Sequence, residues 1–213
     1  MGCWSEVEVM RTNNEFFNEN GFFVVKNICD ISKLKCEVPE ARGQITYYGS
    51  LDKYNAIPTE EQVNGSLSRY SYPPYKSIHS EVRKEIEKVL GSELYNTYYY
   101  DRFYFTGQEL TKHTDRDACE ISISIHIGSN IKKSWEFELM SRKGKHEKVL
   151  LNPGDGLIYA GCDVLHWREK MPVKNKNIFS KLFDKKEELY YHQIFFHYVL
   201  ANGYRSHFAF DMA

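Results

Sequence analysis

A histidine and an aspartate separated by one residue are the first side chains in this sequence that could bind a metal ion. His113 and Asp115 lie in the segment 111-TKHTDRDACE-120. In an extended chain, side chains alternate between two faces, so residues two positions apart point the same way. A His-x-Asp pair also occurs in ordinary polar turns. The pair therefore predicts a metal site only if a third ligand comes to lie beside it.

His166 is the candidate third ligand. It lies 51 residues after Asp115, in the segment 163-DVLHWRE-169 that predicts a strand. That separation allows several strands and their turns, which can bring a distant strand back beside the His-x-Asp pair. Two histidines and one carboxylate on one face of an octahedron leave three positions open, and this ligand set suits non-haem Fe(II).

The length fits one domain of generous size, or two small domains at most, and the composition allows a substantial core. The chain has 213 residues, of which 42% are hydrophobic and 15% aromatic. Its 16 tyrosines and 13 phenylalanines favour β-structure. The net charge of −1 provides no global field that would attract nucleic acid or an acidic membrane. We therefore expect neither as a partner.

Cysteine usage and the lack of a targeting pattern indicate an intracellular protein. The five cysteines are an odd number and include no CxxC pair, which argues against a disulfide framework or a thiolate zinc site. The first residues lack the basic-then-apolar pattern of a signal peptide, and no apolar run approaches a membrane span. The sequence predicts a soluble, cytoplasmic protein.

The N-terminal part predicts a short helix followed by a buried strand. Segment 13–21 reads NNEFFNENG, in which Asn13 or Asn14 can act as the N-cap and Gly21 can end the helix. The apolar run 22–26 predicts the strand.

A second helix is predicted over 79-HSEVRKEIEKVLG-91. Ser80 can cap its start and Gly91 can end it. Its apolar stripe comprises Val82, Ile86 and Leu90. Residues 40–77, rich in Tyr, Gly, Pro and Ser, are expected to form a long irregular excursion.

From residue 94 onward the pattern changes to strands. The predicted strands are 95–105, 121–127, 134–140, 147–151, 156–160, 163–169 and 190–200. In 121-ISISIHI-127 four isoleucines share one face, and two serines and His126 share the other. A helical N-terminal portion followed by about eight strands predicts an α+β domain built on a β-sandwich or jelly roll.

Three segments together resemble the Fe(II)/2-oxoglutarate-dependent dioxygenases, and the prolyl-4-hydroxylase-like branch in particular. The first metal motif of that branch is Tyr, two residues, Gly-Gln, a few residues and His-x-Asp, and 104-YFTGQELTKHTD-115 matches it. The distal motif is a Gly-Asp turn, an apolar strand and His, and 152-NPGDGLIYAGCDVLHWRE-169 fits it. The opening 15-EFFNENGFFVVKN-27 is similar to that of many members. The resemblance covers residues 93–200 well and the N-terminal part loosely.

The resemblance implies a fold for the whole chain. That fold is a double-stranded β-helix, or jelly roll, of about eight antiparallel strands with helices packed on one outer face. Residues 1–213 would form a single dioxygenase domain. Its helical and loop-rich N-terminal part would span 1–92, and the jelly-roll core would span 93–200.

The resemblance also implies an activity. His113, Asp115 and His166 would bind Fe(II), and 2-oxoglutarate would be the co-substrate, with ascorbate as an optional further cofactor. The reaction would hydroxylate an unactivated C–H bond and release succinate and CO2. Members of the family that halogenate lack the carboxylate ligand, so the presence of Asp115 favours hydroxylation.

The distal carboxylate of 2-oxoglutarate needs a cation, and a guanidinium matches it best. The family usually supplies an Arg or Lys about ten residues after the distal His, and this sequence departs from that pattern. Lys176 has the spacing but lies in the polar loop 170-KMPVKNKN-177. Arg168, two residues after His166, faces the same way on an extended chain. We rank Arg168 first and Lys176 second, and a rim ion pair is the alternative role for Arg168.

Three further side chains are candidate co-substrate contacts. The resemblance implies that Tyr104 donates its hydroxyl to 2-oxoglutarate, and a core tyrosine is the alternative. Ser124 and His126 would point into the barrel if the isoleucine face packs against the helices. A hydrogen-bonded core histidine is the alternative for His126.

Two other classes of function stay open. A cupin-like metal-binding module or a non-oxidative metalloenzyme would use the same scaffold without 2-oxoglutarate, and the poor match at the cation keeps this alternative. An interaction domain with a coincidental triad is the third. For the enzyme, a prolyl or other amino-acid side chain, in a peptide or free, is the favoured substrate, and a small metabolite is the alternative.

Overall fold

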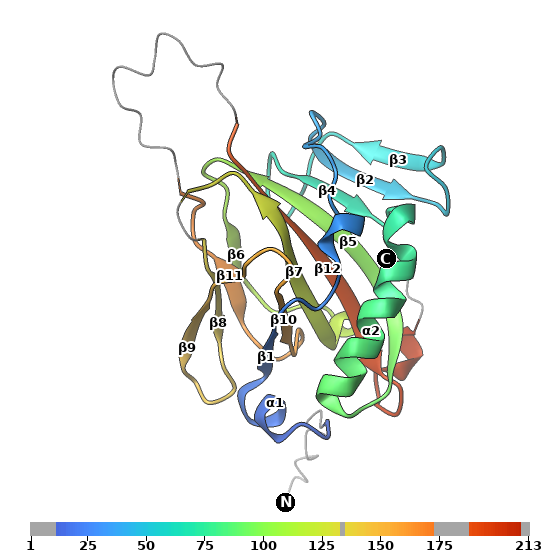
Figure 1. Ribbon diagram of the computed structural model, residues 1–213, viewed down its shortest axis with the longest axis vertical. Helices are drawn as coiled ribbons and strands as arrows, with labels where there is room; N and C mark the ends of the chain where they lie inside the picture. Colours follow the sequence, from blue (N-terminus) through green and yellow to red (C-terminus); the bar gives the residue numbers. More distant parts are fainter. Residues whose placement is uncertain (1–11, 133–134, 173–187, 210–213) are drawn as a thin grey trace, which may run out of the picture.

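A computed structural model describes residues 12–132, 135–172 and 188–209, and within them the chain forms a β-rich molecule (Figure 1). The strands are β1 (Phe22–Val25), β2 (Gly43–Tyr47), β3 (Tyr54–Ile57), β4 (Leu67–Tyr70), β5 (Leu94–Phe105), β6 (Leu110–His113), β7 (Ile121–Ser129), β8 (Phe137–Met140), β9 (His146–Val149), β10 (Gly156–Tyr159), β11 (His166–Arg168) and β12 (Tyr190–Leu200). The α-helices are α1 (Glu15–Asn20) and α2 (Lys76–Leu90). Short 3-10 turns lie at Ile31–Lys33, Pro73–Tyr75, Asp117–Cys119 and Ser206–Phe208.

Eight of these strands build the predicted jelly roll. One sheet contains the run β10-β7-β12-β5, and the other has the order β6-β11-β8-β9. Every pairing inside these two groups is antiparallel. The expectation of about eight antiparallel strands is therefore confirmed.

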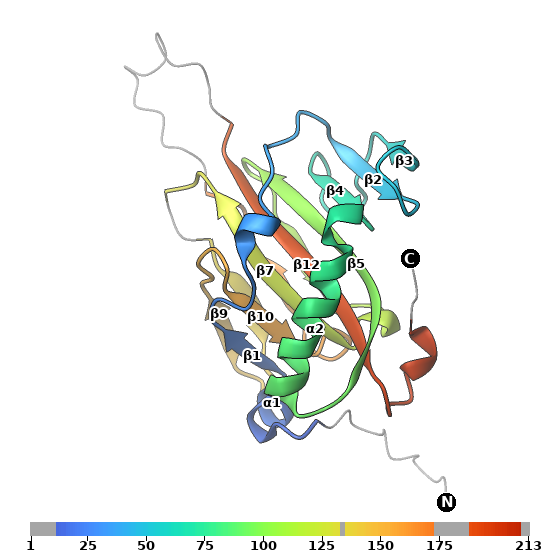
Figure 2. The same cartoon turned by 45° about the vertical axis from the view of Figure 1, so that its right-hand side comes forward.

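The outer face of the larger sheet is covered by α2. The four isoleucines of β7 belong to the same buried cluster as the apolar stripe of the helix, which comprises Ile78, Val82, Ile86 and Leu90. Figure 2 shows α2 lying along this sheet. The isoleucine face of β7 thus packs toward the helix, and the opposite face of the strand is left for the barrel interior.

The sequence predicted both ends of α1 correctly but not the start of α2. In α1 the Asn14 side chain accepts from the backbone N–H of Phe17, and Gly21 ends the helix with φ 78°, as predicted. The predicted start of α2 at Ser80 is wrong, because the 3-10 turn at Pro73–Tyr75 leads directly into the helix at Lys76. Proline has its φ angle preset for a first helical turn, so no hydroxyl cap is needed. None of the helices in the described segments is long and apolar enough to cross a membrane.

The expectation of an irregular excursion over residues 40–77 is wrong. Strands β2, β3 and β4 lie there and extend the larger sheet beyond β5 in the order β5-β4-β2-β3. Each is only four or five residues long, and β3 is an edge strand exposed along its whole length. An edge strand with no buried face has no reason to alternate apolar and polar residues, so the pattern that reveals a strand is missing.

A buried histidine joins α2 to the sheet and makes the fold sensitive to acid. The His79 side chain is 3% exposed, and its Nε2 donates to the carbonyl oxygen of His197 at 3.1 Å. Its ring stacks on Phe196 with 5.1 Å between centroids. Burial lowers the pKa of His79 from 6.5 to about 3.

This shift gives the first prediction. The unfolded chain takes up a proton at His79 near pH 6.5, whereas the folded protein resists it, so stability is full above that pH and falls toward pH 3. Through His79 alone, we expect the free energy of unfolding to be about 2 kcal/mol lower at pH 5 than at pH 7. Urea denaturation across this range should show a shallower pH dependence for His79→Phe. Replacing the exposed His207 with Gln should leave the slope unchanged, and an equal slope for His79→Phe would refute the account.

Candidate metal centre

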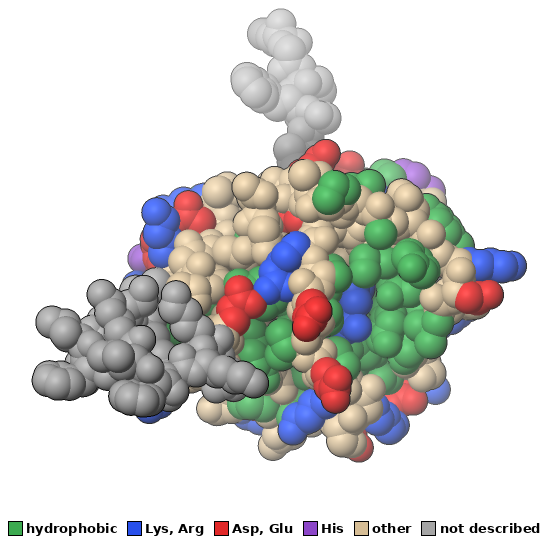
Figure 3. Space-filling view, turned by 90° about the horizontal axis from the view of Figure 1, so that it is seen from above, with side chains coloured by type: hydrophobic (Ala, Val, Ile, Leu, Met, Phe, Trp, Pro, Cys, Tyr) green, Lys and Arg blue, Asp and Glu red, His purple; other side chains and the backbone are tan. Residues whose placement is uncertain are grey.

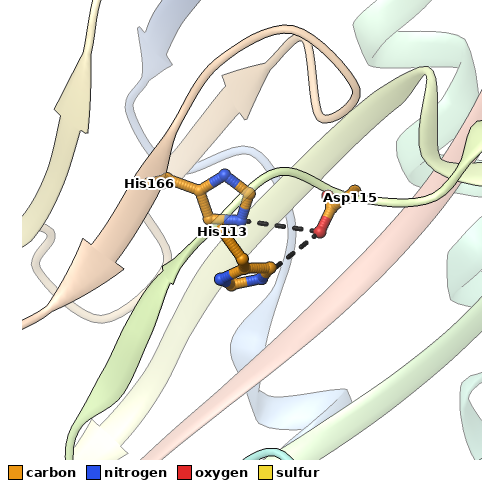
Figure 4. A group of neighbouring side chains, drawn as sticks. All are labelled: His113, Asp115 and His166. Carbon is orange, nitrogen blue, oxygen red and sulfur yellow. Dashed lines mark ion pairs between the residues drawn. The ribbon is translucent and has the colours of Figure 1, made fainter.

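Strand pairing brings the three predicted ligands together (Figure 4). His113 ends β6, His166 begins β11, and the two are direct partners in the antiparallel register. Asp115 follows β6, where its backbone N–H donates to the carbonyl oxygen of Gly161 at 2.8 Å. Asp115 Oδ1 lies 3.6 Å from His113 Nε2 and 3.5 Å from His166 Nε2. One ligand atom from each residue lies within 4.8 Å of the others, which is the spacing of a metal site.

Backbone carbonyl groups orient both imidazole rings. His113 Nδ1 is 2.8 Å from the carbonyl oxygen of Thr111, and His166 Nδ1 is 2.8 Å from that of Val164. Because a carbonyl only accepts, each Nδ1 carries a proton, and each Nε2, which faces Asp115, is the ring nitrogen left to bind a metal ion. This arrangement is the usual preparation of a histidine ligand.

Asp115 remains ionised in this environment. Burial alone raises its pKa, but His166 and His113 lower the pKa of the carboxyl group well below its ordinary value. The centre therefore offers two imidazole nitrogens and one carboxylate, which is the donor set of the facial triad.

The turn before β11 leaves no room for a side chain at Gly161. A Cβ atom there would lie 2.5 Å from Asp115 Oδ2 and 2.8 Å from Ser122 Oγ, and it would also meet the carbonyl oxygen of Cys119. Glycine at this position therefore allows the β10–β11 turn to approach the carboxylate ligand.

A second group of metal-binding residue types, Asp115, Cys119 and His197, shares the carboxylate. Ser122 Oγ lies within this group, 3.0 Å from Asp115 Oδ2 and 2.8 Å from His197 Nδ1. The Cys119 sulfur is 3.2 Å from the hydroxyl of Tyr98, and burial raises the pKa of its thiol well above the ordinary value. The hydrogen bonds of Ser122 and of Tyr98 join this group into a network beside the triad.

Arg168 is a buried cation in the barrel interior. Its side chain reaches the carbonyl oxygen of Trp135 at 2.7 Å, Gln193 Oε1 at 2.9 Å and the hydroxyl of Tyr191 at 3.3 Å. Arg168 is 1% exposed, and within the described residues no carboxylate forms an ion pair with it. A buried charge with only neutral acceptors is costly unless an anion binds beside it.

Two of the other predicted co-substrate contacts pack against residues that contact Arg168. The ring of His126 stacks on Tyr191 at 4.2 Å, and burial lowers its pKa to about 4. The buried ring of Tyr104 packs against Trp135 at 5.1 Å. Ser124 lies two residues before His126 on the same face of β7. Lys176 lies outside the described residues.

Several buried polar atoms near this region lack a hydrogen-bond partner among the described residues. They are Ser124 Oγ, His126 Nε2, Arg168 Nε and Gln193 Nε2. Native proteins leave few buried polar groups unsatisfied, so these four atoms are available to bond water or a polar ligand.

Gln62, in the loop between β3 and β4, lies beside the triad. The sequence analysis did not predict this residue as part of the site. Its Nε2 lies 3.0 Å from His113 Nε2, and its Oε1 accepts from Arg102 Nη1 at 2.8 Å. The buried ion pair of Arg102 with Glu60, 2.7 Å long, anchors this loop. Because Arg102 can only donate, the amide oxygen faces Arg102 and the amide N–H groups face the triad.

The sequence analysis also did not predict that Trp135, Tyr191 and Gln193 would contact Arg168. For the last two a signal existed, because the apolar alternation of β12 places residues 191 and 193 on the face opposite Ile194 and Phe196. For Trp135, which precedes β8, we find no such signal.

No family model matches the sequence, and no curated protein matches it. Solved structures do. A Pseudomonas putida prolyl-4-hydroxylase gives a TM-score of 0.52 at 11% identity, over 85% of this chain and 94% of that one. A Trichoplax adhaerens prolyl hydroxylase in complex with a hypoxia inducible factor peptide fragment gives 0.52 at 13% identity, over 85% of each chain.

A Burkholderia pseudomallei oxidoreductase of the 2OG-Fe(II) oxygenase family gives a TM-score of 0.54 at 12% identity, over 84% of each chain. The chain has the fold of the Fe(II)/2-oxoglutarate oxygenases. This confirms the fold implied by the two sequence motifs. At such low identity the likeness establishes the fold, and the reaction has to be argued from the site.

The close approach at Gly161 gives the second prediction. In Gly161→Ala the new methyl group should displace Asp115, so we expect at least about tenfold weaker binding of Co(II), measured by titration. Gly128, which has open space around it, provides the matched control, and Gly128→Ala should bind like the wild type. Equal Co(II) affinity in Gly161→Ala and the wild type would contradict this role.

Proposed function

We propose that this chain is a non-haem Fe(II)- and 2-oxoglutarate-dependent dioxygenase that hydroxylates an unactivated C–H bond, with release of succinate and CO2. The proposal is carried by two residues on one strand. They are the candidate ligand His166 and the cation Arg168, which has no carboxylate partner among the described residues. Phe137 packs against both, with its ring 5.5 Å from His166 and 5.3 Å from the Arg168 guanidinium.

The residues of the triad fit Fe(II). Two imidazole nitrogens and one carboxylate on one side leave the opposite coordination positions free for other ligands. When bound there, Fe(II) together with 2-oxoglutarate and dioxygen supplies the oxidising power for the C–H bond. The protein holds the ligand atoms in place through the Thr111, Val164 and Gly161 carbonyl groups.

Arg168 fits the distal carboxylate of 2-oxoglutarate. A guanidinium can donate two parallel hydrogen bonds to a carboxylate, and the Arg168 Nε–H still lacks a partner among the described residues. Tyr191 and Gln193, and from the predicted set Tyr104, Ser124 and His126, would supply neutral hydrogen bonds around it. Lys176 stays the second candidate cation.

The buried cation separates this proposal from the alternative. A cupin-like module or a non-oxidative metalloenzyme has no use for a buried guanidinium without a counter-ion, and keeping one costs stability. A 2-oxoglutarate site requires such a cation. Arg168 therefore favours the dioxygenase.

For the substrate we propose a prolyl or other amino-acid side chain, most simply within a peptide. The amide N–H groups of Gln62 face the triad and suit an acceptor such as a peptide carbonyl oxygen. Apolar side chains cover much of the face seen in Figure 3, between acidic and basic ones. On the β2–β3 hairpin, Tyr48 is 61% exposed and Tyr54 is 56% exposed. Exposed apolar surface of this kind is typical of sites that bind other chains.

The direct test is turnover. Purified protein with Fe(II) should convert 2-oxoglutarate to succinate, and His113→Ala should abolish both this reaction and stoichiometric iron binding. His207→Ala, which alters an exposed histidine, should behave like the wild type. Undiminished succinate formation by His113→Ala would contradict the proposal.

Arg168→Met tests the co-substrate site separately. Loss of a charged pair of hydrogen bonds worth about 3 kcal/mol should raise the KM for 2-oxoglutarate about 100-fold. Because a methionine removes an uncompensated buried charge, the free energy of unfolding should stay within about 1 kcal/mol of the wild type. Arg83→Met, on α2, serves as the control. A normal KM in Arg168→Met would assign the anchoring role elsewhere, with Lys176 as the next candidate.

A further inference from the structure

The hydrogen-bonded network beside the triad has a defined direction. The Ser122 hydroxyl lies 3.0 Å from Asp115 Oδ2 and 3.3 Å from the carbonyl oxygen of Cys119. Both oxygens can only accept, so the hydroxyl proton goes to one of them, and the shorter contact is with Asp115. The Ser122 oxygen must then accept from His197 Nδ1–H, 2.8 Å away. The chain of donors therefore runs from His197 through Ser122 to the metal-facing carboxylate.

Strand pairing fixes both donors. Ser122 of β7 and His197 of β12 are direct partners in the antiparallel register. They are 0% and 2% exposed. The His197 ring lies 4.6 Å from that of Tyr98, and the His197 carbonyl oxygen accepts from His79 on α2. The donors therefore belong to the rigid centre of the larger sheet, whereas Asp115 lies in a turn after β6.

We propose that Ser122 and His197 are positioning residues that hold the Asp115 carboxylate in its metal-binding orientation. With Oδ2 engaged by Ser122, Oδ1 is left facing His113 and His166. Without the network, the carboxylate is free to rotate away from the two histidines. This role rests on the proposed function, because it presumes that the triad binds a divalent metal.

The network has a measurable energetic consequence. Loss of a partner that orients a metal ligand typically weakens metal binding 10–100-fold. Ser122→Ala and His197→Leu should therefore each weaken Co(II) binding by a factor in that range. The amide of asparagine can place an N–H near the position of His197 Nδ1, so His197→Asn should retain most of the affinity.

The experiment is a Co(II) titration of the full chain, followed by the visible absorption of the bound ion, with thermal unfolding of each metal-free variant in parallel. Two controls separate positioning from a general loss of structure. His192→Asn alters a buried histidine on the other face of β12, where it bonds Asp101, and should lower stability without changing Co(II) affinity. Ser80→Ala removes a hydroxyl on α2, outside the barrel, where it accepts from Asn96, and should leave Co(II) affinity unchanged.

The expected result is weaker Co(II) binding in Ser122→Ala and His197→Leu, restoration in His197→Asn, and a stoichiometry of one ion per chain. Wild-type affinity in both Ser122→Ala and His197→Leu would overturn the positioning role and leave the proposed function intact. Equal weakening in His197→Asn and His197→Leu would also overturn it. A second equivalent of Co(II) with a thiolate charge-transfer band would show that Cys119 and His197 bind metal instead. No Co(II) binding by the wild type would refute the proposed function and this role together.

Discussion

The pairing of β6 with β11 is the constraint on which the candidate site depends. It places His113 directly opposite His166, with 4.3 Å between the ring centroids, although the two residues are far apart in the chain. A slip of one residue in this pairing would turn one imidazole to the other face of the sheet and dismantle the site. The hydrogen bond from Asp115 to Gly161 fixes the third ligand relative to the same two strands.

Two fully buried arginines in the barrel differ in whether the described residues provide a counter-ion. Arg102 has the carboxylate of Glu60 as its counter-ion and also bonds Gln62 and Ser68, so its charge is satisfied by the protein and anchors a loop. Arg168 bonds only neutral groups within the described chain. The first arginine is explained by structure alone, whereas for the second we propose an anionic ligand. This contrast is the physical basis for the proposed 2-oxoglutarate side of the barrel.

The sequence predicts those elements and site residues that follow from the periodicity of apolar residues or from motif spacing. Strands β5, β7 and β12 and the apolar stripe of α2 were predicted because long buried elements repeat their pattern several times. Strands β2, β3 and β6 were missed because they are short and partly exposed, so they show no clear apolar pattern. Strand β4 was missed because two of its buried residues, Ser68 and Arg69, are polar. The triad was predicted from two motifs, and Arg168 from its spacing to His166. The contacts of Gln62 with His113 and of Ser122 with His197 depend on how loops and strands meet in space, and no local pattern encodes them.

The most direct test of the central claim is the visible absorption of the anaerobic protein with one equivalent of Fe(II), recorded as 2-oxoglutarate is added. A 2-oxo acid that chelates Fe(II) through its keto oxygen and carboxylate produces a metal-to-ligand charge-transfer band. We predict that this band appears and saturates at one 2-oxoglutarate per chain. Iron-loaded protein that shows no such band at saturating 2-oxoglutarate would contradict the assignment of this barrel as a dioxygenase site.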